Sequence, residues 1–144
     1  MLGYTAGVYD LFHVGHLRLL ERAAAGCDHL TVGVTTDELS FSAKGKYPIV
    51  PFEERSALVA AVRFVDAVVP QHDIDKFVAW QELGFDRIFV GSDWQGTPRW
   101  VALEERFASV GVEVVYLPYT ESTSSTALRL QIESLLSSAP DPAS

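Results

Sequence analysis

Residues 8–16 read Val8-Tyr9-Asp10-Leu11-Phe12-His13-Val14-Gly15-His16, and they join two different hydrophobic patterns. Before them, residues 1–7 form a short apolar run that is typical of a central strand. After them, residues 14–25 place leucine and alanine at the spacing of one face of a helix. The stretch is therefore predicted to lead from a buried strand into a helix whose first turn carries two histidines.

The two histidines suggest a site for phosphate. Residues three apart on a helix lie on one face, so the imidazoles of His13 and His16 should point the same way. The first turn of a helix also presents unpaired backbone N–H groups, and Gly15 leaves that backbone open to an anion. Two other interpretations stay open here. The histidines could bind zinc, although Cys27 is the sole thiol and no further ligands stand at a recognisable spacing, or they could serve only in packing.

Composition limits the class of protein. The chain has 144 residues, of which 48% are hydrophobic and 21% charged, and this suits one globular domain with a real core. Its net charge of −8 argues against non-specific binding to nucleic acid or to anionic membranes. No leader pattern begins the chain, no apolar run is long enough to span a membrane, and one cysteine excludes an intrachain disulfide. We expect a cytoplasmic protein with no nucleic-acid partner and no membrane insertion.

Strand and helix patterns alternate along the rest of the chain. Strands are expected at 29–35, 67–70, 87–91 and 113–117. Helices are expected from residue 52, at 74–83, from 97 to about 110 with Thr97 as N-cap, and from 124 or 125 to 136, while the polar passage 36–51 reads as a loop. The pattern predicts an α/β fold, a doubly wound parallel sheet of about five strands in a single domain at 1–136, followed by a disordered tail at 137–144. In such sheets ligands bind beyond the carboxyl ends of the strands, so loops 7–16, 35–51, 91–97 and 118–125 should share one edge.

Tyr9 to His16 resembles the His-x-Gly-His signature of the nucleotidyltransferase superfamily, whose fold is Rossmann-like. Later segments resemble its branch of cytidylyltransferases that act on glycerol 3-phosphate, and the likeness runs from about Thr5 to Leu128. These segments are Leu20-Glu21-Arg22-Ala23, Thr36-Asp37-Glu38, Val65-Asp66, Gly91-x-Asp93-Trp94 and Thr120-Glu121. The resemblance implies transfer of CMP from CTP to glycerol 3-phosphate or a similar small phosphorylated alcohol, with Mg²⁺ accompanying CTP. It also implies a homodimer.

The resemblance further implies roles for single residues. The implied catalytic residues are His13, His16 and Lys46. The implied nucleotide contacts are these three together with Val8, Tyr9, Val14, Gly15, Tyr119, Thr120, Glu121, Ser122, Thr123, Ser124, Ser125 and Thr126. The implied contacts to the acceptor are Lys44, Lys76, Asp37, Arg55, Arg63 and Asp93, and Asp10 is a candidate ligand of Mg²⁺.

Each of these residues also has a plainer interpretation. The two lysines around Gly45 could lie in a solvated loop. Arg55 and Arg63, eight residues apart and so on one face of the expected helix, could pair with nearby carboxylates. Aspartates that follow strands often cap helices or form turns, and the hydroxyl-rich segment 120–126 could be an ordinary N-cap.

Two departures from the branch concern the nucleotide. Tyr119 stands where the branch has arginine and Ser122 stands where it has glycine, so one positive group is lost from the nucleotide side. Two alternative functions remain at this point: an adenylyltransferase of the same superfamily that uses ATP, and a nucleotide-binding protein without turnover.

Overall fold

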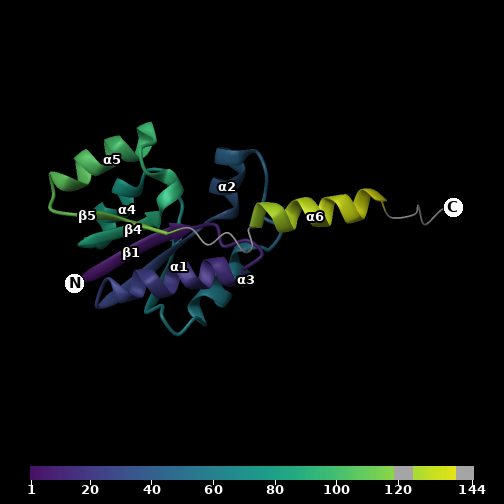
Figure 1. Cartoon of the computed structure of the whole chain (residues 1–144), viewed down its shortest axis with the longest axis horizontal. Coiled ribbons are helices and arrows are strands. Elements are labelled where there is room, and N and C mark those ends of the chain that lie inside the picture. Colours follow the sequence, from purple (N-terminus) through teal and green to yellow (C-terminus); the bar gives the residue numbers. More distant parts are fainter. Residues whose placement is uncertain (119–124, 139–144) are drawn as a thin grey trace.

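The computed structural model describes residues 1–118 and 125–138 as a five-stranded parallel sheet with helices on both faces (Figure 1). The strands lie in the order β3-β2-β1-β4-β5, so β1 is central and the strand order reverses beside it. Their bounds are Leu2–Gly7 (β1), His29–Thr35 (β2), Ala67–Gln71 (β3), Arg87–Gly91 (β4) and Glu113–Leu117 (β5). The predicted doubly wound parallel sheet is confirmed, and all five carboxyl ends meet at one edge.

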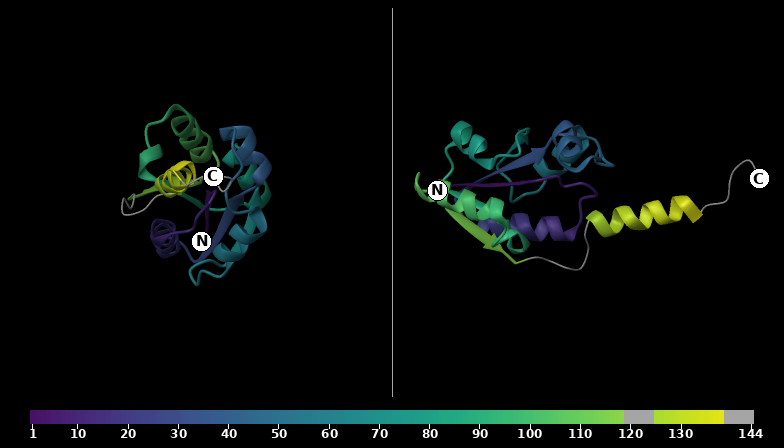
Figure 2. Two further views of the ribbon diagram at one scale, coloured as in Figure 1. Left: turned by 90° about the vertical axis from the view of Figure 1, so that its right-hand side faces the viewer. Right: turned by 90° about the horizontal axis from the view of Figure 1, so that it is seen from above.

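Two apolar layers hold the helices to the sheet. Helices α1 (Val14–Ala25) and α3 (Phe52–Ala60) cover one face, where Leu20 and Val59 pack on the buried valines of β2. Helices α4 (Lys76–Leu83) and α5 (Pro98–Ala108) cover the other face, where Phe107 packs beside Tyr4 of β1. Figure 2 shows the sheet between these layers. Successive side chains along β1 and β2 therefore point into two separate hydrophobic cores, one on each face of the sheet.

The passage predicted as a loop contains a helix, α2 (Asp37–Lys44), so that prediction was wrong. Local capping explains the helix. The Thr36 hydroxyl accepts a hydrogen bond from the Leu39 N–H, and Asp37 and Glu38 in the first turn suit the positive end of the helix. Gly45 ends it in the left-handed conformation at φ 74°. Although the passage is polar, it contains the N-cap, the acidic first turn and the C-terminal glycine that begin and end a helix.

Several predicted boundaries also move. Helix α4 begins at Lys76, because the Asp75 carboxylate accepts from the Phe77 N–H and so caps the helix. The predicted N-cap of α5 at Thr97 is confirmed by position, but the Thr97 hydroxyl donates to the Trp94 carbonyl and makes no capping hydrogen bond. A short 3₁₀ turn, η1 (Ser92–Trp94), occupies part of the loop after β4.

Helix α6 (Ser125–Ser138) projects from the edge where the strands end (Figure 1). It continues two residues beyond the predicted end at 136, so the first part of the predicted tail is helical, and 139–144 lie outside the described residues. Within the described part of the chain, no helix is long and apolar enough to cross a membrane.

We predict that Gly33→Ala is destabilising because β2 passes close to Tyr4. A Cβ at position 33 would overlap the Tyr4 hydroxyl, which itself donates to the buried Gln71 side chain. Overpacking of this kind costs about 3 kcal/mol, at the upper end of the usual range. Urea unfolding of wild type and variant measures the loss.

Gly84→Ala is the matched control. A Cβ there meets nothing within 4 Å, but φ is 68°, so only the left-handed backbone is penalised, by about 1 kcal/mol. If Gly33→Ala cost no more than Gly84→Ala, the close packing of β2 against Tyr4 would be contradicted.

Candidate active site

The loop between β1 and α1 is held in an unusual backbone conformation. Tyr9 and Leu11 have φ values of 55° and 52°, in the left-handed region that residues with a Cβ rarely occupy. Tyr9 is buried, and its ring folds back over Gly7, where a Cβ would lie 3.1 Å from the ring. Strain of this kind persists only where surrounding contacts fix it, and it is common in ligand-binding sites.

The two histidines form the cap of α1. His13 is the N-cap residue, and its Nδ1 accepts from the Gly15 N–H at 3.0 Å. The Nδ1 of His16 accepts in turn from the His13 N–H at 3.2 Å. The two rings stack with centroids 4.0 Å apart, which confirms that they lie on the same side. Because each Nδ1 accepts, the hydrogen-bond network assigns the ring proton of each neutral imidazole to Nε2, so both can donate from Nε2.

Both imidazoles are neutral at pH 7. Burial lowers the pKa of His16 to about 4, and the neighbouring His13 lowers it further while the Asp10 carboxylate opposes the shift. Burial also lowers the pKa of His13. The first turn of α1 therefore offers hydrogen-bond donors without a full positive charge on either ring.

Asp10 joins three segments. Its carboxylate accepts from the backbone N–H groups of Ile49 and Val50, each at 2.9 Å, and from Arg129 on α6 at 2.8 Å. A carboxylate that accepts from three nitrogen donors is poorly suited to Mg²⁺, which prefers oxygens not already bonded to hydrogen donors. Among the described residues, no three histidine, cysteine or acidic side chains gather as a metal site. The geometry does not fit a protein-held Mg²⁺ at Asp10.

Arg55 is fully buried at the carboxyl ends of β1 and β2. Its Nη1 donates to the Val8 carbonyl at 2.6 Å and to the Thr35 carbonyl at 2.8 Å. Its Nε donates to the Val50 carbonyl at 2.8 Å, and its Nη2 to the Asp37 carboxylate at 2.6 Å. In this structure Arg55 therefore positions the loops that carry site residues, without an exposed face for the acceptor.

Arg63 does not share a helix with Arg55. Helix α3 ends at Ala60, so the predicted common helical face was wrong. Arg63 is exposed in the turn that follows, with its guanidinium 5.1 Å from the centre of the Phe64 ring. Ala61 is the C-cap residue of α3, and the chain then turns towards edge strand β3.

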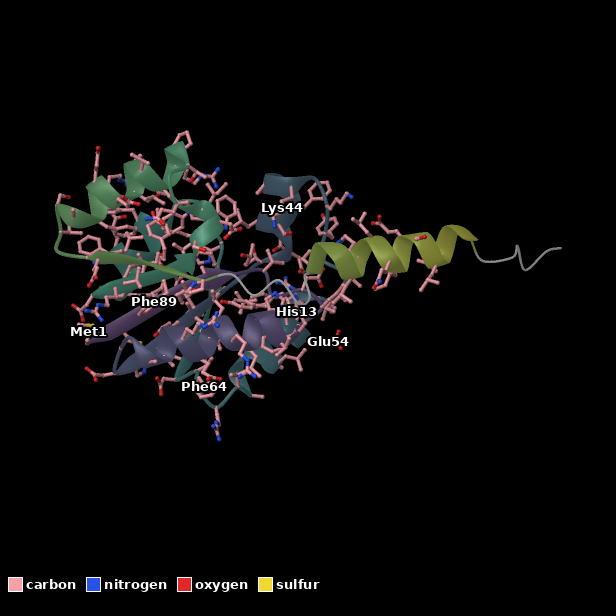
Figure 3. The ribbon with its side chains drawn as sticks, viewed as in Figure 1. Met1, His13, Lys44, Glu54, Phe64 and Phe89 are labelled. Atoms are coloured by element: carbon pink, nitrogen blue, oxygen red, sulfur yellow. The ribbon has the colours of Figure 1, made fainter. Side chains whose placement is uncertain are left out.

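The predicted lysines surround the same edge of the sheet. Lys44 ends α2 and Lys46 follows Gly45, and both are exposed (Figure 3 labels Lys44 and His13). Lys76 begins α4, and its pKa is lowered by burial and then by the positive charges of Arg99 and Lys44. The structure thus places both Lys44 and Arg99 within electrostatic reach of Lys76.

The remaining predicted residues are placed in part. Asp93 lies exposed on η1, and Asp37 is a partly exposed member of the Arg55 ion pair. Val8, Val14 and Gly15 lie in the β1–α1 junction itself. The predicted contacts Tyr119, Thr120, Glu121, Ser122, Thr123 and Ser124 fall outside the described residues, and Ser125 and Thr126 begin α6.

Sequence reasoning missed two cations at this edge, Arg99 and Arg129. Arg99 is the second residue of α5. Arg129 lies four residues after Ser125, which begins α6, and so one turn along the same helix face. Because segment 120–126 was already a predicted nucleotide site, the four-residue spacing from Ser125 was a sequence signal that could have identified Arg129.

Both the sequence and the structure of this chain match known proteins. A family model described as cytidylyltransferase-like matches residues 4–131. The glycerol-3-phosphate cytidylyltransferase of Bacillus subtilis is 34% identical, over 91% of this chain and 96% of that protein. The FAD synthase of Pyrococcus abyssi is 38% identical, over 80% of this chain and 78% of its own length. The solved structure of a lipopolysaccharide core biosynthesis protein from Thermoplasma volcanium superimposes with a TM-score of 0.70 at 25% identity, covering 85% of this chain and 98% of that one.

We predict that Arg55→Lys destabilises the protein although it conserves the charge. One ammonium cannot reproduce the fork by which Arg55 reaches three carbonyls and the Asp37 carboxylate. Each buried carbonyl left without a donor costs about 1–3 kcal/mol. Chemical denaturation gives the loss, with the exposed Arg63→Lys as control. A loss below that of the control would show that the buried network contributes little.

We also predict that His16 makes stability depend on pH. Its folded pKa of about 4 lies below the ordinary 6.5, so the unfolded chain takes up the proton first as the pH falls. The stability that this group contributes is present above pH 6.5 and is lost as the pH falls towards 4. Between pH 7 and 5, wild type should therefore lose more unfolding free energy than His16→Gln. His72→Gln, which removes an exposed imidazole, is the control and should lose as much unfolding free energy as wild type. An equal loss of unfolding free energy in wild type and His16→Gln would contradict the burial of His16.

Proposed function

This chain belongs to the cytidylyltransferase-like family and is a nucleotidyltransferase, and on that premise we propose that it transfers CMP from CTP to glycerol 3-phosphate or a similar small phosphorylated alcohol. The observation that carries the proposal is the pair of stacked histidines that cap α1, with an Nε2–H donor on each ring. The B. subtilis relative supports the choice of CTP and of a glycerol phosphate acceptor, because the likeness extends over nearly the whole of both chains.

The reaction would be an in-line displacement at phosphorus. A phosphate oxygen of the acceptor attacks the α-phosphorus of CTP and forms the new P–O bond. The bond from the α-phosphorus to the oxygen that bridges it to the β-phosphate breaks, and pyrophosphate leaves with that electron pair. No covalent intermediate with the protein is needed, so catalysis consists of positioning and charge stabilisation.

The residues at the carboxyl edge would divide this work. The Nε2–H groups of His13 and His16 and the first N–H groups of α1 would donate to phosphate oxygens on which negative charge builds. Lys46 would hold the departing phosphates, and Lys44 and Lys76 the acceptor phosphate. Arg55, fully buried, would act by positioning Asp37 and the end of β1.

Three expectations stay predictions. Mg²⁺ bound by the phosphates of CTP would supply charge neutralisation, without a ligand at Asp10. The family resemblance implies a homodimer, and the composition of the sequence favours a cytoplasmic location.

Pyrophosphate release, measured with glycerol 3-phosphate and each of the four nucleoside triphosphates, tests the proposal. We expect release with CTP and, by mass spectrometry, formation of CDP-glycerol. The P. abyssi relative makes ATP the informative comparison. A preference for ATP would reject the cytidylyl assignment, and release that does not depend on the acceptor would reject glycerol 3-phosphate.

His16→Ala is the catalytic control for this assay. Removing one preorganised donor should lower kcat by at least about 10²-fold, while CTP binding weakens less. A variant that retained more than half of the wild-type kcat would remove His16 from the mechanism.

A further inference from the structure

Three aromatic rings contact the imidazole of His16. The His13 ring stacks on it with centroids 4.0 Å apart, and the Phe12 ring stacks on it at 5.3 Å with an angle of 30° between the planes. The Tyr9 ring meets it edge-on at 5.4 Å, with an angle of 63°. His16 is therefore held by ring contacts as well as by its place on the first turn of α1.

Two of these rings also contact the hydrophobic core. Tyr9 is a buried member of the core cluster that includes Leu20 of α1 and Leu117 of β5, and Phe12 packs against the same cluster. The centroids of the Phe12 and Tyr9 rings lie 6.4 Å apart. The core thus supports both rings from one side, and both rings contact the imidazole of His16.

The backbone beside Phe12 is in an unfavourable conformation. Leu11, which precedes it directly, has a φ of 52°, and Tyr9 has a φ of 55°. Neither residue is glycine, so each left-handed conformation costs free energy that other contacts of the loop must offset. The turn at Leu11 places the next side chain, the Phe12 ring, against the core and against His16.

The orientation of the imidazole decides which atom of His16 faces a phosphate. Its Nδ1 accepts from the His13 N–H at 3.2 Å, which assigns the ring proton to Nε2. One hydrogen bond leaves the tilt of the ring plane open, whereas contacts on its faces and edge restrict it. Protonation of Nδ1 would break this bond, and burial opposes protonation by lowering the pKa of His16. The ionisable neighbours His13 and Asp10 shift that pKa in opposite directions.

We propose that Phe12 is a positioning residue of the transfer reaction, whose ring, together with that of Tyr9, holds the imidazole of His16 in the plane in which Nε2 donates to the reacting phosphate. The proposal rests on the proposed function for the part that His16 takes in turnover. Phe12 acts through His16 and touches no substrate. A misplacement of about 1 Å in a reacting group can lower a rate by about 10²-fold, so such support has kinetic consequences.

A double-mutant cycle between Phe12 and His16 tests the proposal. Phe12→Leu keeps an apolar side chain but removes the ring, so kcat should fall about three- to tenfold while the KM for CTP changes less than about twofold. Phe12→Tyr keeps the ring and should retain more than half of the wild-type kcat. In the His16→Gln background, Phe12→Leu should cause no further fall in kcat, because the group through which Phe12 acts is already absent.

An NMR titration of the imidazole provides a measurement that needs no turnover. In Phe12→Leu, water gains access to His16, so the pKa of His16 should rise from about 4 towards the ordinary 6.5. Val68→Ala is the matched control, because Val68 packs against the same core cluster from β3. This control should lower the free energy of unfolding without changing the pKa of His16.

Three results would overturn the proposal. An unchanged kcat in Phe12→Leu would show that the ring has no part in turnover. An equal fall in kcat in the wild-type and His16→Gln backgrounds would show that Phe12 does not act through His16. A pKa of His16 that stays unchanged in Phe12→Leu, or that rises equally in Val68→Ala, would show that the ring does not hold the imidazole. Because the titration involves no nucleotide, its result stands whether or not the proposed function holds.

Discussion

One buried guanidinium connects the sheet to the site. Arg55 donates to the carbonyls of Val8 and Thr35, just past the end of β1 and at the end of β2, where the hydrogen-bond ladder stops and carbonyl groups lose their strand partners. It also donates to Val50 and to the Asp37 carboxylate, so that desolvation of the charge is offset by four bonds. The loop after β1 and the start of α2 are therefore fixed by one residue of α3. Loops without regular secondary structure can therefore hold ligand-facing side chains in fixed positions.

The β1–α1 loop shows what this support makes possible. Tyr9 and Leu11 hold left-handed backbone conformations on either side of Asp10, and each costs on the order of 1 kcal/mol or more. The buried Tyr9 ring, the bonds to Asp10 and the Arg55 bond to Val8 fix that conformation. The result is an N-cap made of histidine, in which the backbone determines which ring nitrogen donates.

Charge is distributed unevenly in this acidic protein. The turn expected to meet the most negative part of a substrate carries neutral imidazoles and backbone N–H groups, while cations approach from α2, α4, α5 and α6. Lysine side chains on exposed segments suit groups that enter and leave, whereas the Asp10 carboxylate holds Arg129 in place. Separate helices supply these charges, yet they still repel one another, because Arg99 and Lys44 add to the effect of burial in lowering the pKa of Lys76.

The sequence by itself determined the succession of strands and helices along the chain, because it follows from short-range periodicity. It also placed the two histidines on the first turn of α1, because helix starts follow from local capping. It failed at α2, where capping residues outweighed a polar composition, and at Arg63, where α3 ends before the residue is reached. Only the tertiary structure decided what Asp10, Arg55 and Arg129 do. Their partners lie up to 119 residues away along the chain. The local sequence around an aspartate that follows a strand does not show whether its carboxylate binds a metal ion or pairs with an arginine. That choice depends on which loops converge at the carboxyl edge of the sheet, and no local pattern encodes it.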